Sequence, residues 1–189
     1  MGILSLPFIL LVLLLLFFEN LLRLDPLRPL FYGEIRMSCD QKFKLYKFNI
    51  FKNGIVEHIR ENHKHVETKH LERSGSTTFV GWILKQIYMD ELPQIWNVLK
   101  GEMSMVGPRP LNLRVYENLS TEEKKTREKI NAGITGNFQS HKNNRGMKAS
   151  VLDKEYFEIF CSKSSTELIK ADIKIMLRTI KIILRAEGI

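Results

Sequence analysis

The chain of 189 residues carries 29 lysines and arginines against 21 aspartates and glutamates, and its hydrophobic fraction is 44%. This length predicts one domain with one modest core, and the net charge of +8 favours an anionic partner: nucleic acid, phospholipid headgroups or a phosphorylated substrate. The two cysteines, Cys39 and Cys161, are far apart in the chain and form no C-x-x-C pair, which argues against a disulfide framework and a cysteine-based zinc site.

The apolar N-terminus predicts a membrane segment. Only Ser5 and Pro7 interrupt the apolar run from Ile3 to Phe18, and from Phe8 onwards it is apolar on every helical face. As a helix this run covers about 24 Å, less than the ~30 Å hydrocarbon core of a bilayer. A signal peptide would need a basic start and a small-residue cleavage site, which this sequence does not offer. We therefore expect residues 1–24 to insert into the membrane, in a shallow or tilted arrangement rather than a full span.

The charges beside this segment predict its orientation. No Lys or Arg precedes the apolar run, whereas Arg23 and Arg28 follow it closely. The positive-inside tendency then places residues 25–189 on the cytoplasmic face of the membrane as a second domain. Pro26 and Pro29 make a helical continuation past Leu24 unfavourable.

The remaining sequence predicts an α+β fold that is predominantly helical, with a short strand region. Residues 42–51 alternate imperfectly between apolar and basic side chains, as in a half-buried strand. A helix is expected to begin with Asp90 as its N-cap and to stop at Gly101. Ser120 and Glu123 form a capping box for a further helix, and a glycine-rich turn follows at 133–136.

Four histidines lie in the polar stretch 52–76, at His58, His63, His65 and His70. They invite a metal hypothesis, but no carboxylate or cysteine pattern accompanies them, and a solvated loop is the better interpretation.

The last helix is expected to be amphipathic and to run roughly from Glu167 to Arg185. Its expected apolar face is Ile169, Ile173, Met176, Ile180 and Leu184, and its basic stripe is Lys170, Lys174, Arg178, Lys181 and Arg185. The pattern fits ordinary packing on the core, and it equally fits binding to anionic lipid headgroups.

The block from Asp90 to Pro110, DELPQIWNVLKGEMSMVGPRP, carries the chemistry. Its two carboxylates stand at the expected start of a helix, where free N–H groups favour anions, phosphates included. Adjacent carboxylates repel each other and the substrate phosphates, so a Mg²⁺ ion bridging carboxylate and phosphate oxygens would be needed. Pro108 and Pro110 stiffen the backbone around Arg109, whose guanidinium suits a bidentate phosphate contact.

This block closely resembles the signature of the bacterial sugar transferases, the monotopic polyprenyl-phosphate phosphoglycosyl transferases that begin polysaccharide and glycoconjugate assembly. Further segments are similar to that family's motifs. They are Leu45–Phe48 (its Y-K-F strand), Gly81–Lys85 (its approach to the acidic pair), Gly133–Gly136 with Gln139 (its P-G-I-T-G-x-x-Q turn), and Asp172–Ile175 with Thr179 (its final helix).

The resemblance implies a reaction and assigns roles to residues. Asp90 would attack the sugar-linked phosphorus of a UDP-sugar, release UMP and carry the phosphosugar until a polyprenyl phosphate accepts it. Glu91 would help to hold Mg²⁺, and Lys85 and Arg109 would bind phosphate charge. Three more matching positions are expected around the site: Lys47, Arg127 and Gln139. The enzyme would work at the bacterial inner membrane, with anionic lipid headgroups as further partners.

The sequence departs from the family pattern at several positions. Ser5-Leu6-Pro7 stands at the Ser-Pro break, Asn49 replaces an arginine, Asn131-Ala132 replace Arg-Pro, and Asn137 replaces a tryptophan. The departures leave a catalytically weak, membrane-bound assembly subunit as an alternative. A membrane-tethered nucleic-acid binder is disfavoured, because the terminal basic stripe has no interleaved aromatic residues.

Overall fold

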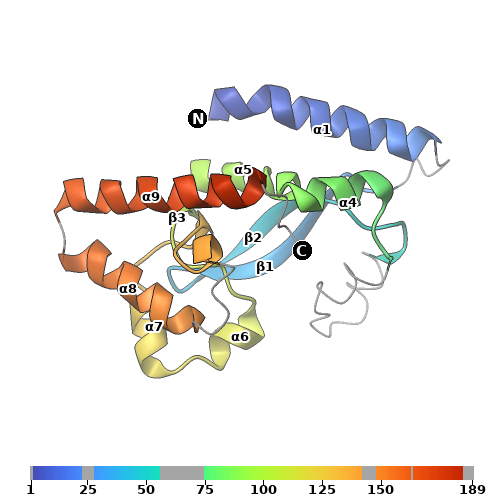
Figure 1. Ribbon diagram of the computed structural model, residues 1–189. Coiled ribbons are helices and arrows are strands. Elements are labelled where there is room, and N and C mark those ends of the chain that lie inside the picture. The colour runs from blue at the N-terminus through green and yellow to red at the C-terminus, as the bar shows by residue number, and fades with distance from the viewer. Residues whose placement is uncertain (1, 23–27, 56–74, 142–147, 163, 185–189) are drawn as a thin grey trace. The chain divides into compact units, whose positions relative to one another are not determined.

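The computed structural model describes residues 2–22, 28–55, 75–141, 148–162 and 164–184. The fold is mixed α/β and mainly helical, as predicted from the sequence (Figure 1). In chain order its elements are α1 (Gly2–Leu22), β1 (Phe31–Ser38), β2 (Gln41–Phe48), α4 (Phe79–Gln86), the 3₁₀ helix η1 (Met89–Glu91), α5 (Gln94–Leu99), β3 (Ser104–Val106), α6 (Leu113–Glu117), α7 (Thr121–Arg127), β4 (Gly133–Thr135), the 3₁₀ helix η2 (Gln139–His141), α8 (Ala149–Ser162) and α9 (Ser165–Leu184). The predicted histidine-rich loop lies mostly outside the described residues.

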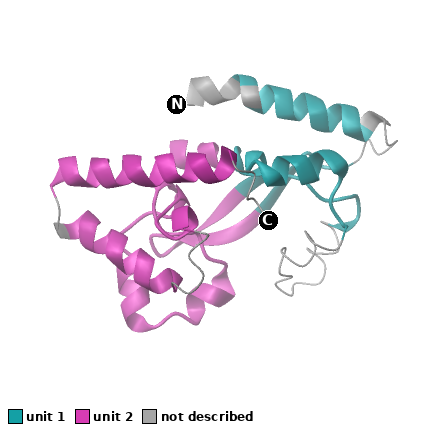
Figure 2. Ribbon diagram, viewed as in Figure 1, with its two compact units in different colours: residues 1–33, 46–93, 186–189 teal, residues 34–45, 94–185 magenta. Residues whose placement is uncertain are grey.

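The chain forms two compact units (Figure 2). Unit 1 comprises Met1–Gly33, Tyr46–Pro93 and Ala186–Ile189, and unit 2 comprises Glu34–Leu45 and Gln94–Arg185. The predicted acidic pair belongs to unit 1, whereas Arg109 and the glycine-rich turn belong to unit 2.

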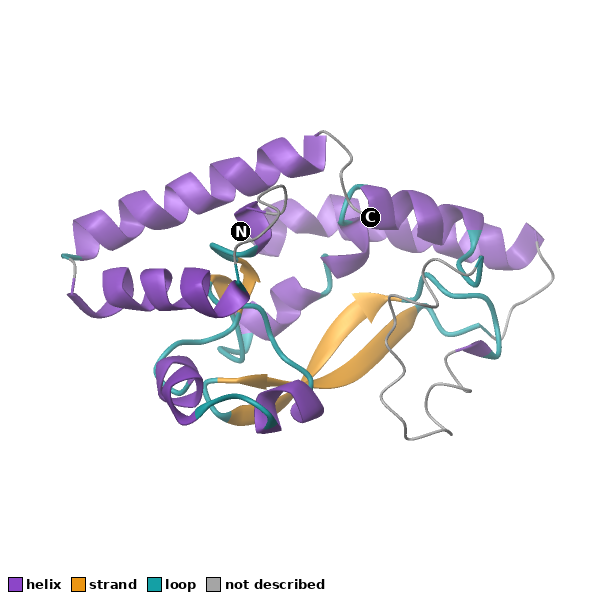
Figure 3. Ribbon diagram, turned by 60° about the horizontal axis from the view of Figure 1, so that its bottom comes forward, coloured by secondary structure: helices purple, strands orange, loops and turns teal. Residues whose placement is uncertain are grey.

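Strands β1 and β2 form a hairpin (Figure 3). The expected strand over 42–51 corresponds to β2, but its partner β1 was not foreseen. The two-residue turn consists of Cys39 and Asp40, with φ angles of 47° and 58°. Positive φ at both turn residues is the type I′ geometry that matches the twist of a hairpin.

One face of α1 contributes to the core of unit 1. Val12 and Leu16 are buried together with Phe48 of β2 and Leu84 of α4. Leu16 is 0% exposed, and burying such a side chain stabilises the fold by about 1.5–3 kcal/mol. The opposite face remains exposed and consists of Leu10, Leu11, Leu14, Leu15, Phe17 and Phe18. Within the part of the chain that the structure describes, no helix has the length and apolar content needed to cross a membrane.

The core of unit 2 lies where α8 and α9 meet the short parallel sheet β3–β4. Val106, Ile130, Tyr156 and Ile175 form a buried cluster. In the sheet, Ser104 pairs with Gly133 and Val106 pairs with Thr135, so the glycine-rich turn is in fact a strand. This strand places Gly107 and Gly133 so close together that a side chain on either would overlap the other's backbone.

Helix α9 has the predicted length, but its buried face differs from the expected one. Ile175 is buried and Met176 packs beside it, whereas Ile169, Ile173, Ile180 and Leu184 are exposed together with Leu177. Asp172 accepts a hydrogen bond from the Tyr156 hydroxyl, and the Thr179 hydroxyl bonds that of Thr135. These polar contacts help to determine which face of α9 packs on the core, and the spacing of apolar residues alone does not predict that face.

Candidate active site

The acidic pair lies in a 3₁₀ turn and not at the start of an α-helix. Asp90 and Glu91 belong to η1, and α5 begins only at Gln94. The cause is Pro93, which has no N–H to donate to the Met89 carbonyl in an α-helical bond. The Leu92 N–H bonds that carbonyl instead and closes the turn in 3₁₀ fashion. The prediction that Asp90 is an N-cap is therefore wrong.

The two carboxylates of the pair each have a lysine partner within unit 1. Lys85 Nζ lies 3.6 Å from Asp90 Oδ2, and Lys47 Nζ lies 3.3 Å from Glu91 Oε1. Asp90 is 1% exposed, whereas the Glu91 side chain is 16% exposed. The structure thus brings together four of the predicted site residues and separates a buried carboxylate from a more accessible one.

Lys85 reaches Asp90 because α4 is held tightly at its start. The Thr78 hydroxyl caps the helix by accepting from the Gly81 N–H at 3.0 Å, and the Thr78 N–H donates to the Ile50 carbonyl at 2.9 Å. A Cβ added to Gly81 would lie 2.8 Å from Ile50 Cα, closer than side chains tolerate. Glycine at position 81 therefore lets α4 lie directly on the backbone that follows β2.

Unit 2 holds the three remaining predicted residues. Arg109 is exposed and lies in the turn between β3 and α6. Arg127 Nη1 donates to the Arg109 carbonyl oxygen at 2.8 Å, so Arg127 supports the Arg109 backbone. Gln139 is half-buried in η2, and its Oε1 atom is buried without a hydrogen-bond partner among the described residues.

Asp153 of α8 is a residue that the sequence interpretation missed. Its carboxylate pairs with Arg127 Nη2, and the two side chains are 8% and 10% exposed. Burial raises the pKa of Asp153, and the positive charge of Arg127 opposes that shift. Helix α8 itself was not predicted, and its partner lies 26 residues away, so no local signal identified this pair.

Two sequence departures turn out to have structural contacts of their own. Asn131 Nδ2 donates to the Gly101 carbonyl at 3.3 Å, and Ala132 is buried with its N–H bonded to Ser38 Oγ. Asn137 Nδ2 donates to the Leu152 carbonyl of α8 at 3.2 Å. These positions therefore contribute to the packing of unit 2.

The chemistry of the acidic pair fits Mg²⁺. Mg²⁺ keeps several waters and takes one or two carboxylates together with substrate phosphates. Asp90 and Glu91 supply two carboxylates within one turn, and the more exposed Glu91 is the better placed to meet a hydrated ion. Among the described residues, no group of three or more His, Cys, Asp or Glu side chains could hold a metal ion.

Comparison with known proteins identifies the class. Residues 2–186 match the family described as bacterial sugar transferase. The chain is 33% identical over 175 residues to the uncharacterized sugar transferase EpsL of Bacillus subtilis, covering 92% of this chain and 79% of that protein. It is 30% identical over 176 residues to the undecaprenyl-phosphate galactose phosphotransferase of Salmonella typhimurium, covering 85% of this chain and 34% of that protein.

A similar likeness holds for the undecaprenyl-phosphate glucose phosphotransferase of Komagataeibacter xylinus, which is 31% identical over 178 residues. This match covers 85% of the chain and 30% of the relative, so the chain spans about a third of both named phosphotransferases. The chain belongs to the bacterial sugar transferase family and is an enzyme of the phosphoglycosyl transferase type. The resemblance drawn from the sequence motifs is thereby confirmed.

Proposed function

We propose that this enzyme transfers a sugar-1-phosphate from a UDP-sugar to a membrane polyprenyl phosphate. An oxygen of Asp90 attacks the sugar-linked phosphorus, the bond from that phosphorus to the bridging oxygen breaks, and UMP leaves with the electron pair. A phosphate oxygen of the polyprenyl phosphate then attacks the same phosphorus. The acyl-phosphate bond breaks, Asp90 is released as a carboxylate, and polyprenyl-diphospho-sugar is formed.

The observation that carries this proposal is the buried Asp90 carboxylate beside Lys85. A buried carboxylate is poorly hydrated, which favours nucleophilic attack, and the Lys85 ammonium supplies a positive charge beside it. The phosphates of an incoming substrate offer Lys85 a stronger anionic partner than Asp90 alone. The lysine can then move its charge to the phosphate while Asp90 attacks.

Glu91 and Lys47 form the outer part of the same site. We assign to Glu91 the role of helping to hold Mg²⁺, which would neutralise charge on the diphosphate. Lys47 keeps the Glu91 side chain oriented until the substrate phosphates arrive. Arg109 provides a planar guanidinium on a stiff backbone for a bidentate phosphate contact, and Arg127 supports that backbone. Gln139 matches a family position, and we assign it only to the surroundings of the site.

The acceptor lipid places the reaction at a membrane surface, for which we propose the cytoplasmic face of the bacterial inner membrane. The exposed leucines and phenylalanines of α1 suit shallow insertion among acyl chains. On α9 the exposed row of apolar side chains is flanked by exposed Lys170, Lys174 and Lys181, which suit anionic headgroups. Arg28, one of the two cations used to predict the orientation of the membrane segment, is buried in an ion pair with Glu19.

The test is UMP release by the full chain in lipid nanodiscs with polyprenyl phosphate, Mg²⁺ and a panel of radiolabelled UDP-sugars. One sugar should give UMP and a labelled lipid product, and Asp90→Asn should abolish both while leaving the fold intact. Near-normal UMP release by Asp90→Asn would remove the covalent mechanism. A chain that binds membranes but gives no product with any UDP-sugar would instead be the catalytically weak assembly subunit.

A further inference from the structure

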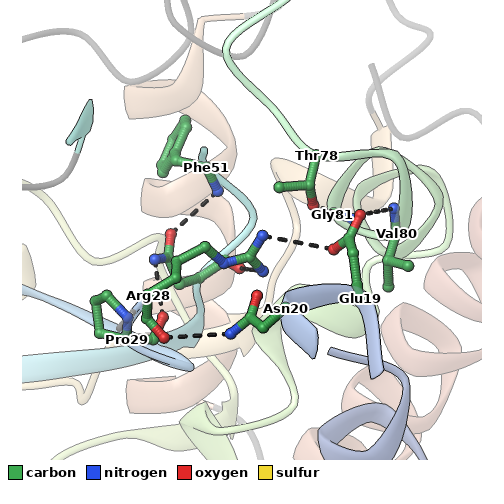
Figure 4. A network of polar contacts seen from close by, with 9 residues as sticks. Glu19, Asn20, Arg28, Pro29, Phe51, Thr78, Val80 and Gly81 are labelled. Atoms are coloured by element: carbon green, nitrogen blue, oxygen red, sulfur yellow. Dashed lines mark hydrogen bonds and ion pairs between the residues drawn. The ribbon is translucent and has the colours of Figure 1, made fainter. Parts of the chain in front are cut away.

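A buried polar network joins the C-terminal end of α1 to the start of α4 (Figure 4). Glu19 Oε2 lies 3.5 Å from Arg28 Nη1, and their side chains are 6% and 2% exposed. Arg28 Nη2 donates to the Asn49 carbonyl oxygen at 3.2 Å, and Asn20 Nδ2 donates to the Arg28 carbonyl at 3.3 Å. All four residues belong to unit 1.

The second oxygen of Glu19 acts on α4. Glu19 Oε1 accepts a hydrogen bond from the Val80 N–H at 3.1 Å, as Figure 4 shows. Val80 is the second residue of α4, so its N–H is one of the donors that a helix leaves unsatisfied at its start. Thr78 already caps the next donor, at Gly81. Glu19 therefore adds to the cap of α4 from another helix, and its negative charge stands at the positive end of the helix dipole.

The network is fixed to the backbone beyond β2. Asn49 is 1% exposed; its Nδ2 donates to the Pro29 carbonyl at 2.9 Å, and its Oδ1 accepts from the Phe51 N–H at 3.0 Å. Arg28 is thus held at the Asn49 carbonyl, and Glu19 is held by Arg28. The Glu19 carboxylate is therefore held at both oxygens, by Arg28 at one and by the Val80 N–H of α4 at the other.

Helix α4 connects the Glu19 contact at its start with Lys85 near its end. The helix has only eight residues, and Lys85 lies in its last turn, 3.6 Å from the Asp90 carboxylate. A short helix pinned at its start cannot slide or rotate without displacing the side chain at its end. We infer that Glu19 is a positioning residue for the reaction: through Val80 and α4 it sets the placement of Lys85 against Asp90. This inference rests on the proposed function.

Two variants at Glu19 separate positioning from folding. Glu19→Gln keeps an oxygen that accepts from Val80 but removes the charge that holds it to Arg28. The double variant Glu19→Leu with Arg28→Met removes both buried charges, a change that is often neutral for stability, and it also removes the cap. We expect both proteins to fold, the first to react slower, and the second to lose about tenfold in the single-turnover rate of UMP release.

The decisive measurement repeats the double variant in a Lys85→Ala background. If Glu19 acts through Lys85, the tenfold loss shrinks to less than about twofold there, because coupled residues are not additive. The matched control is Glu123→Gln, which alters a carboxylate at the start of α7 in unit 2. Its effect, whatever its size, should be the same in both backgrounds. An equal loss for the Glu19 double variant in both backgrounds would overturn the inference.

A spectroscopic measurement distinguishes failure of the positioning role of Glu19 from failure of the proposed function. In protein with ¹³C-labelled aspartate carboxyls, the Asp90 resonance is assigned by its loss in Asp90→Asn. We expect it to shift in Glu19→Gln and to stay unchanged in Glu123→Gln. An unmoved resonance in Glu19→Gln would overturn the positioning role even in an active enzyme. A shifted resonance with normal UMP release by Asp90→Asn would retain the coupling and reject the proposed nucleophile.

Discussion

Replacing Arg127 by methionine should destabilise the enzyme strongly. Methionine keeps much of the side-chain volume but leaves the Asp153 carboxylate, 8% exposed, without its cationic partner. Removing one member of a buried ion pair costs about 3–5 kcal/mol, and losing the hydrogen bond to the Arg109 carbonyl adds about 1 kcal/mol. At 2–4 °C per kcal/mol for a chain of this size, a loss of about 4–6 kcal/mol lowers the unfolding midpoint by roughly 8–24 °C.

The loss of stability in Arg127→Met should depend on pH in a defined direction. Without Arg127, burial and the negative charge of Glu123 both raise the pKa of Asp153, so its pKa in the folded variant rises further above the unfolded value. A raised folded-state pKa means that the folded protein binds the proton more tightly than the unfolded chain does. The variant is therefore most stable below the usual Asp pKa and loses stability as the pH rises toward the folded-state pKa. The deficit should be larger at about pH 7 than at about pH 4.

The assay is thermal unfolding of the full chain in detergent, followed by circular dichroism at both pH values. The control combines Arg127→Met with Asp153→Leu, which removes both charges and should recover most of the lost stability. Two results would refute the reasoning: a single variant as stable as the unaltered protein, or a double variant no more stable than the single one. Either would mean that the Arg127–Asp153 pair is not a buried electrostatic contact in solution.

Four further perturbations test other parts of the site. Arg109→Lys should lower kcat/KM about tenfold or more, because a lysine loses the planar fork, and equal activity would leave only a point charge as the requirement. Gly81→Ala should cost about 1–3 kcal/mol of stability and slow UMP release, since α4 must move away from Ile50. Glu91→Gln should raise the Mg²⁺ concentration needed for half-maximal activity, measured by titration of the metal. A cysteine at Gly2, in a background without the two native cysteines, should resist a membrane-impermeant periplasmic reagent in intact cells; strong labelling would establish a full span.

Local patterns in the sequence predicted where helices and strands lie more accurately than they predicted which residues these elements contact. The capping box of Ser120 and Glu123 is present as predicted, because both of its hydrogen bonds form within four residues. Strand β2 and the length of α9 also agree with their patterns. The turn at Asp90 differs from the prediction because Pro93 cannot donate to the Met89 carbonyl, so the α-helix begins only after it.

Long-range contacts account for the remaining differences. Arg28 had the features of a cation beside a membrane segment, yet its partners Glu19 and Asn49 bury it. The spacing of these residues in the sequence does not predict that Arg28 pairs with Glu19 and Asn49, because the pairing depends on how the chain returns from α1 to β2. The buried face of α9 likewise depends on Tyr156 and Thr135, which belong to distant segments. Apolar residues occur around most of that helix, so periodicity alone left its orientation open.

The depth of Asp90 has a consequence for the fate of an activated sugar. An acyl phosphate is open to hydrolysis, and water is present in great excess over any lipid acceptor. With Asp90 only 1% exposed, a phosphosugar attached there would be approached by few water molecules. Whether the phosphosugar is hydrolysed or transferred to the lipid would then depend on which nucleophile reaches the site, and not on which is more abundant. A carboxylate at the surface would turn the same chemistry into wasteful cleavage of the nucleotide sugar.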